Sequence, residues 1–145
     1  MNGESSLVGD DIVPQIELAQ RKTQEARYSI AASAALILFV SGGDGGGVIY
    51  ILSIIFAGMA LVWSSIYYWS SFEIEKGFRL RFIRASVDGA FDGDEMTCEK
   101  WDMRWLWWHL DLSDLSNKIA LISFASSALL FGVSGAIFSR VAESI

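Results

Sequence analysis

The residues best suited to chemistry lie between positions 88 and 109, where acidic side chains are followed by the single cysteine and the single histidine. The stretch DGAFDGDEMTCE at 88–99 has enough carboxylates to raise the question of calcium binding. An EF-hand loop needs oxygen-bearing side chains at loop positions 1, 3 and 5 and a glycine at position 6. Counting from Asp88 places Ala90 at position 3, and counting from Asp92 places Met96 at position 5. We therefore expect a solvated turn and no metal site.

Cys98 and His109 are each alone in the chain, so no intrachain disulfide and no set of metal ligands is expected. The sequence has no paired carboxylates, no Ser–His–Asp or Cys–His arrangement, and neither a GxxxxGK nor an HExxH motif. We therefore predict no catalytic residue, no bound cofactor and no enzymatic activity.

Four tryptophans fall within eight positions, at Trp101, Trp105, Trp107 and Trp108. On a helix, Trp101, Trp105 and Trp108 share one face and Trp107 flanks it. Indole rings prefer the boundary between membrane and water, where the ring is in an apolar environment and the N–H stays hydrated. We expect a helix that lies in this interface or packs between subunits. The alternative is a cage that binds a cationic ligand.

Residues 72–91 (FEIEKGFRLRFIRASVDGAF) are predicted to form an amphipathic helix that leaves the membrane, with Ile74, Phe78 and Phe82 at four-residue spacing. Its basic residues would lie near anionic headgroups, where each contributes about 1 kcal/mol. We favour simple anchoring by positive charge. The alternative is a binding patch for an anionic ligand such as a nucleotide or a lipid headgroup, formed by Arg79, Arg81 and Arg84.

The composition indicates which elements must position these residues. Hydrophobic residues make up 52% of the 145 positions, charged residues only 19%, and a single proline occurs. Such a composition is typical of membrane proteins rather than of soluble domains. The net charge of −6 argues against nucleic acid as the main partner, because phosphate binding needs clustered Lys and Arg. The first twenty residues are polar and acidic, so no signal peptide is expected.

Three stretches are predicted to cross a bilayer. Residues 48–69 contain no charge and would extend about 33 Å as a helix, close to the roughly 30 Å thickness of the hydrocarbon. Residues 119–139 are equally free of charge. Residues 28–43 would extend only about 24 Å, which is short for a span. The glycine-rich turn at 41–47 nevertheless joins them to the next span as a hairpin. The alternative for 28–43 is a buried helix inside an oligomer.

The first span is expected to continue a helix that begins in the N-terminal segment. Asp10 or Asp11 can cap its start and Pro14 fits a first turn, so the helix should run from about Ile12 to Val40. Before the third span, Ser113 or Ser116 is expected to cap the helix.

Positive charge predicts the orientation of the chain. Ten of the eleven basic residues fall on one side of the predicted spans. Basic residues in short loops mark the cytoplasmic side, so the N-terminus is expected inside and the C-terminus outside an inner or plasma membrane. The predicted fold is an all-α membrane protein with three transmembrane helices, an N-terminal hairpin plus a C-terminal span. Its parts are a cytoplasmic amphipathic helix (1–27), the hairpin (28–70), a cytoplasmic amphipathic and Trp-rich interfacial region (71–118), the third span (119–139) and a short tail (140–145).

Small residues recur along the predicted spans. Helices associate in lipid by close packing, because burial against another helix gains little over burial in lipid tails. Three spans form only a thin bundle, so these stripes predict a homo-oligomer. The predicted packing residues are Ala57 and Ala60 in the second span and Ala128, Gly132 and Ala136 in the third.

Two functions are consistent with these features. No Asp, Glu, Lys, Arg or His lies within the predicted spans, which argues against a pump or coupled transporter. The first hypothesis is a homo-oligomer that forms or gates a pore, with the hydroxyls of Ser123, Ser126 and Ser127 along a weakly polar path. A hairpin followed by a cationic helix is similar, in architecture alone, to lesion-forming holins and to membrane effectors of bacterial antiviral defence. The second is a non-enzymatic, membrane-anchored adaptor or accessory subunit that recruits a cytoplasmic or membrane partner through its N-terminal helix or residues 72–116.

Overall fold

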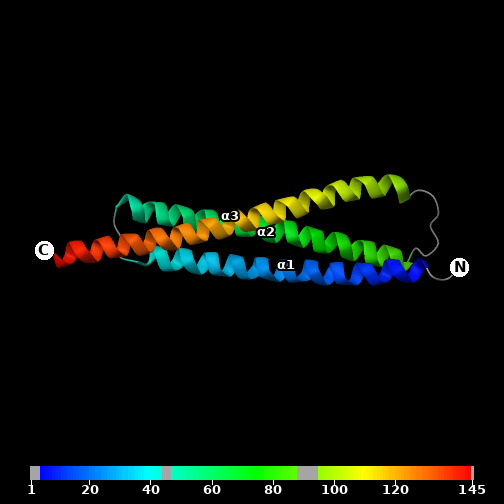
Figure 1. Ribbon diagram of the computed structural model, residues 1–145, viewed down its shortest axis with the longest axis horizontal. Coiled ribbons are helices and arrows are strands. Elements are labelled where there is room, and N and C mark those ends of the chain that lie inside the picture. Colours follow the sequence, from blue (N-terminus) through cyan, green and yellow to red (C-terminus); the bar gives the residue numbers. More distant parts are fainter. Residues whose placement is uncertain (1–3, 44–46, 88–94, 145) are drawn as a thin grey trace.

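The computed structural model describes the backbone of residues 4–43, 47–87 and 95–144, and the side chains of residues 14–43, 47–80 and 104–144. This part of the chain forms three helices, α1 (Glu4–Ser41), α2 (Val48–Val87) and α3 (Glu95–Glu143). They lie along one common long axis, with α2 antiparallel to α1 and α3 (Figure 1). At 1.5 Å per residue, α3 extends roughly 70 Å, more than twice the thickness of a bilayer core.

α1 is one continuous helix through the predicted first span, in agreement with the helix expected from Ile12 to Val40. Its start differs from the prediction, because the helix begins at Glu4 and Pro14 lies inside it. A proline inside a helix removes one backbone hydrogen bond, but it does not end α1.

Two of the three helices contain a segment long and apolar enough to cross a membrane, within Val48–Leu80 of α2 and Arg104–Glu143 of α3. Over the residues that the structure describes, α1 does not meet the same criterion. Its charge-free part begins only after Arg27 and ends at the glycine turn, which leaves fewer apolar residues than a full span requires.

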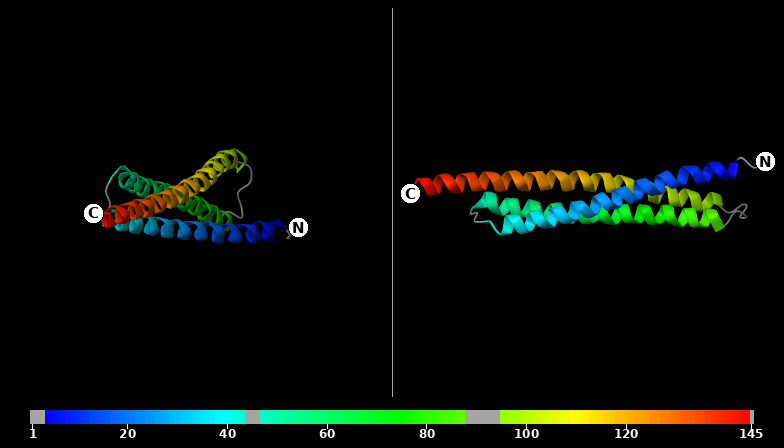
Figure 2. Two further views of the ribbon diagram at one scale, coloured as in Figure 1. Left: turned by 60° about the vertical axis from the view of Figure 1, so that its left-hand side comes forward. Right: turned by 90° about the horizontal axis from the view of Figure 1, so that it is seen from below.

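The helix start predicted between the Trp-rich region and the third span is wrong. Both belong to α3, which continues without a break from Glu95 to Glu143. Ser113 and Ser116 therefore do not cap a helix, and both are fully buried inside α3. The basic segment after the second span is likewise a continuation of α2 as far as Val87. Figure 2 shows each helix as one unbroken rod, with the C-terminal end of α3 extending past the turn between α1 and α2.

The buried and exposed side chains are inverted relative to a soluble protein. Serine and alanine predominate among the buried positions that the structure describes, whereas large apolar side chains such as Leu38 and Leu129 are more than 70% exposed. A soluble domain buries its large apolar residues. The inverted arrangement is the one expected where the surrounding medium is itself apolar.

The buried residues repeat with spacings of four and three, or of seven where one position is skipped, along each helix. This 3.5-residue period is that of a left-handed coiled coil. The buried positions are Ala19, Thr23, Ala26, Ser33 and Val40 on α1; Ser53, Ala57, Ala60, Ser64, Tyr67, Ser71 and Ile74 on α2, with Ser70 beside them; and His109, Ser113, Ser116, Ala120, Ser123, Ser127 and Ser134 on α3.

Candidate functional site

The bundle divides into two halves along its axis. We call residues 28–43, 48–66 and 117–139 the hairpin half, because they adjoin the turn between α1 and α2. Residues 14–27, 67–80 and 104–116 form the Lys22 half. The same 3.5-residue period of buried positions continues through both halves.

In the hairpin half, Ser53 and Ser127 form a reciprocal contact between α2 and α3. The Ser53 hydroxyl donates to the Ser127 carbonyl oxygen at 2.9 Å, and the Ser127 hydroxyl donates to the Ser53 carbonyl oxygen at 2.9 Å. The two Oγ atoms are 3.3 Å apart, and neither residue is exposed. The small side chains bring the two backbones close, and each hydroxyl is satisfied without water.

Ser64 makes the corresponding contact between α2 and α1. Its Oγ lies 2.7 Å from the Oγ of Ser29 and 3.2 Å from the Oγ of Ser33. Nearer the turn, the Tyr50 hydroxyl donates to the carbonyl oxygens of Val40 at 2.9 Å and Gly43 at 3.1 Å. α2 is thus the central helix, with hydroxyl contacts to both neighbours.

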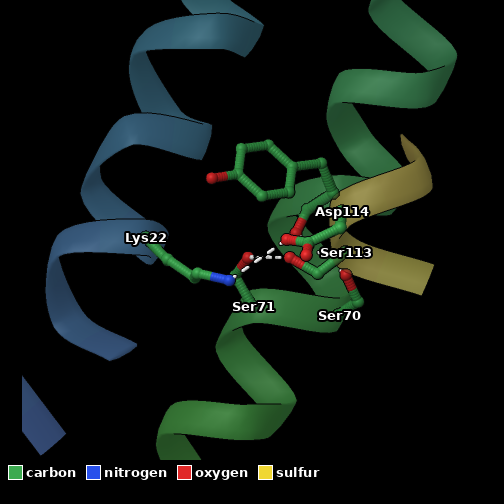
Figure 3. Close-up of polar contacts among 6 residues, drawn as sticks. Lys22, Ser70, Ser71, Ser113 and Asp114 are labelled. Atoms are coloured by element: carbon green, nitrogen blue, oxygen red, sulfur yellow. Dashed lines mark hydrogen bonds and ion pairs between the residues drawn. The ribbon is translucent and has the colours of Figure 1, made fainter. Parts of the chain in front are cut away.

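All three helices meet in the Lys22 half (Figure 3). Lys22 of α1 reaches Asp114 of α3, with 3.2 Å between Nζ and Oδ1. Beside this pair, the Oγ atoms of Ser71 on α2 and Ser113 on α3 are 3.2 Å apart. The ion pair is partly solvated, since the Asp114 side chain is 65% exposed, and such pairs contribute about 0–1 kcal/mol.

His109 lies between α2 and α3 in the Lys22 half, surrounded by three indole rings. Its ring centroid is 4.3 Å from that of Trp105, 4.8 Å from Trp108 and 5.2 Å from Trp69, each in an edge-to-face geometry. We call these four residues the His109 cluster. Gly77 of α2 permits it, because a Cβ there would lie 3.0 Å from the Trp105 ring.

The imidazole of His109 is only 2% exposed, although the indoles around it remain partly accessible. Its Nδ1 atom has no hydrogen-bond partner among the described residues. Buried polar atoms are usually paired, so an unpaired ring nitrogen at a helix interface is unusual.

The predicted tryptophan and arginine sites differ in their surroundings, since some of these side chains are held by contacts and others are exposed. Trp105 and Trp108 belong to the His109 cluster, whereas Trp107 is 60% exposed. Arg79 of the predicted anion-binding patch is held by Glu75 one turn earlier, at 2.8 Å. The side chains of Trp101, Arg81 and Arg84 lie outside the described residues.

The predicted pore-lining serines do not share one environment. Ser123 and Ser127 are buried within the bundle and Ser126 is half-buried. Hydroxyls packed between α2 and α3 do not face a water-filled path in this arrangement.

The predicted packing residues also separate into two groups. Ala57 and Ala60 are completely buried between helices. Ala128, Gly132 and Ala136 are exposed, and a Cβ on Gly132 would have no atom within 4 Å. Within one chain, α3 therefore packs through its serine face and leaves this second small-residue face uncovered.

Sequence reasoning placed Ser64 in the small-residue stripe of the second span, but it missed the His109 cluster and the contact between Ser71 and Ser113. The signal that could have found them is the alternation of four- and three-residue spacings among Ser and Ala, which continues past the ends of the apolar stretches.

The polar groups buried between the helices are mainly neutral hydroxyls and one imidazole. Among the described residues, no group of three or more His, Cys, Asp or Glu side chains is placed to hold a metal ion. Comparison of the chain with protein-family models, curated proteins and solved structures finds no match.

Proposed function

We propose that the chain is a small multi-pass membrane protein that self-associates and forms or gates a pore. The observation that supports this proposal is the inverted burial, with serine and alanine inside the bundle and large apolar side chains outside. Large exposed apolar surfaces mark contact with lipid or with other protein chains.

In this proposal three segments cross the membrane, namely 28–43, 48–69 and 119–139. The short first segment is accommodated by its packing against α2, where Ser29 and Ser33 contact Ser64. The basic residues put the N-terminus and the Lys22 half on the cytoplasmic side. The C-terminus is then outside.

The exposed face of α3 is the proposed contact between copies. Small residues follow one another along it with alternating spacings of three and four, at Ala125, Ala128, Gly132, Gly135 and Ser139. This is the same spacing that the intrachain contacts use, and exposed small residues permit close approach of another helix.

The proposed path becomes polar only when the bundle opens. In the closed arrangement Ser123 and Ser127 face other helices. Separation of α2 from α3 would add their hydroxyls to that of Ser126 along a weakly polar wall, without any ionised group in the spans. The absence of ionised groups favours a passive pore over coupled transport.

The test is membrane depolarisation, followed with a potential-sensitive dye during induced expression in a bacterial host. We expect rapid depolarisation with the natural chain and its loss with Gly132→Ile, because the added side chain blocks contact between copies. The matched control is Gly58→Ile on α2, since a Cβ added at either glycine would have no atom within 4 Å. Depolarisation that persists in Gly132→Ile at equal membrane insertion would contradict the proposed interface.

An adaptor is the second candidate, and the observation that favours it is the length of the helices. All three continue well beyond their apolar segments, which gives the Lys22 half a folded surface with exposed charges such as Glu17 and Arg21. On this hypothesis the Lys22 half recruits a cytoplasmic protein or an anionic ligand. Expression would then leave the membrane potential unchanged.

A further inference from the structure

We propose that His109 is a proton-responsive contact, which holds α2 against α3 while its imidazole is neutral and releases α2 when the ring is protonated. The loosening of the contact stands on the geometry of the His109 cluster alone. Only its link to conduction rests on the proposed function.

The geometry favours a neutral ring. His109 is 2% exposed, and three indoles occupy the positions where water would otherwise solvate it. A neutral imidazole carries one N–H donor and one acceptor nitrogen, whereas the protonated ring needs an acceptor for both nitrogens. Nδ1 has no partner within the described residues, so the added proton would meet no acceptor there.

Charged groups around the cluster come from both helices that form it. Burial lowers the pKa of His109, and the Glu73 carboxylate on α2 opposes this effect by favouring the charged ring. Lys76 lies one turn beyond Glu73. On α3, Arg104 and Asp111 are the nearest charged residues in sequence, and both are exposed.

On α1, Lys22 is engaged by Asp114 five positions beyond His109. Two further α1 charges lie near α2 in this region: Glu25 acts electrostatically on Tyr67, and Arg27 lies 5.8 Å from the centroid of the Tyr68 ring.

Glu73 is half-buried, so its carboxylate keeps some access to solvent. Protonation therefore favours movement of the imidazole outward, toward Glu73 and water. Indole faces can also attract a cation, but they supply no hydrogen-bond acceptor for Nδ1.

Release would act on the neighbouring hydroxyl contact. Ser113 lies one helical turn from His109 and pairs with Ser71 of α2 at 3.2 Å. An outward movement of His109 and its indoles would separate this pair first. Burial lowers the pKa of His109 in the closed contact, so the state with the separated contact binds protons more readily. By linkage the closed contact is fully stable above about pH 6.5, the ordinary pKa of histidine, and loses stability as the pH falls toward the lowered pKa.

The experiment uses disulfide cross-linking of the full chain in lipid nanodiscs, with Cys98 replaced by serine. One variant carries Ser71→Cys with Ser113→Cys next to the His109 cluster. A second carries Ser53→Cys with Ser127→Cys at the distant contact, as a reference for the effect of pH on thiol chemistry itself. At each pH, the cross-linking rate of the Ser71–Ser113 variant is divided by that of the Ser53–Ser127 variant. This ratio is measured at pH 7.5 and at pH 5.5.

We expect this ratio to fall at least threefold on acidification in the natural background and to stay constant with His109→Phe, which keeps a ring but cannot bind a proton. A constant ratio in the natural background, or an equal fall with His109→Phe, would overturn the proposal. Because His109 is the only histidine, nitrogen-15 labelling of histidine reports its protonation directly, provided the affinity tag contains none. A ring that is already protonated at pH 7.5 would also overturn it.

Dye leakage from liposomes at the same pH values separates this inference from the pore. Release of the contact without leakage would retain the inference and reject the pore. Leakage that is independent of pH would retain the pore and reject the link between the His109 contact and conduction.

Discussion

The two halves of the bundle bury different side chains at equivalent positions. In the hairpin half, apart from Val40 near the turn, the buried residues are serine and alanine. In the Lys22 half, serines and alanines are still buried, but Ile74 and His109, and Tyr67 at the end of the proposed second span, join them in the same 3.5-residue pattern. One repeat thus continues from one half to the other, and a few large side chains enter it only in the Lys22 half.

This difference corresponds to the medium that each half is proposed to face. Where lipid surrounds the helices, burying a large apolar side chain gains little, so contacts depend on close approach and hydroxyl bonds. Where water surrounds them, burial of large side chains stabilises the bundle by removing apolar surface from solvent. Each prediction below tests one side of this comparison.

The largest effect is expected for Ile74→Ala in the Lys22 half. Ile74 is 2% exposed, and removal of a buried isoleucine side chain typically costs about 2–5 kcal/mol. The measurement is the free energy of unfolding in mild detergent with denaturant. Ile51→Ala is the control, because Ile51 is 57% exposed in the hairpin half and should change stability by less than about 0.5 kcal/mol. Equal losses from the two variants would remove the distinction between the halves.

Ala60→Leu should destabilise the hairpin half by overpacking. Ala60 is completely buried between helices, and added methylene groups in a packed interior cost about 1–3 kcal/mol. The same unfolding measurement applies, with Gly58→Leu as the control because a Cβ there meets no atom within 4 Å. If Gly58→Leu were the more disruptive variant, the assignment of buried faces on α2 would be wrong.

Ser127→Ala should have a smaller effect, since it removes the bond from its hydroxyl to the Ser53 carbonyl and the contact between the two Oγ atoms. The Ser53 hydroxyl keeps its bond to the Ser127 backbone. Such interhelical bonds in membranes average about 0.6 kcal/mol and reach about 1.7. Ser126→Ala, at a half-buried position, is the control and should be close to neutral. Conductance that responds to Ser126→Leu with unchanged stability would support a pore-lining role for that residue.

The smallest effect is expected for the Lys22–Asp114 pair. A double-mutant cycle with Lys22→Ala and Asp114→Asn should give a coupling of about 0–1 kcal/mol, because the pair is exposed to solvent. Salt screens exposed charges, so the coupling should shrink further at about 1 M ionic strength. A coupling of several kcal/mol that resists salt would mean that this contact is shielded in an assembly.

The sequence was sufficient to predict an all-helical chain and the continuity of α1 through Val40, because long charge-free stretches are local signals. It was not sufficient to predict which small residues meet. Ser127 and Ala128 are adjacent, yet one is fully buried and the other exposed, since a helix turns by about 100° per residue. Which face points inward depends on α2, whose matching serines lie more than 40 positions away.

His109 illustrates the same limit. Its indole neighbours Trp105 and Trp108 are local, but Trp69 comes from another helix and completes the cluster only through the antiparallel register of α2 and α3. A single histidine therefore has no identifiable role until that register is known. The helix start expected near Ser113 also made His109 seem separate from the third predicted span, although both belong to α3.

The unbroken course of α3 has a mechanical consequence. Between Trp105 and Ser127 the helix contains no proline and no glycine, and no other helix type interrupts it. These positions are about 33 Å apart along the axis at 1.5 Å per residue. A twist imposed on α3 at its tryptophans meets no such hinge before Ser127, which lies near the middle of the proposed third span. This part of α3 is therefore stiff, and its stiffness determines how far along the helix a local twist is transmitted.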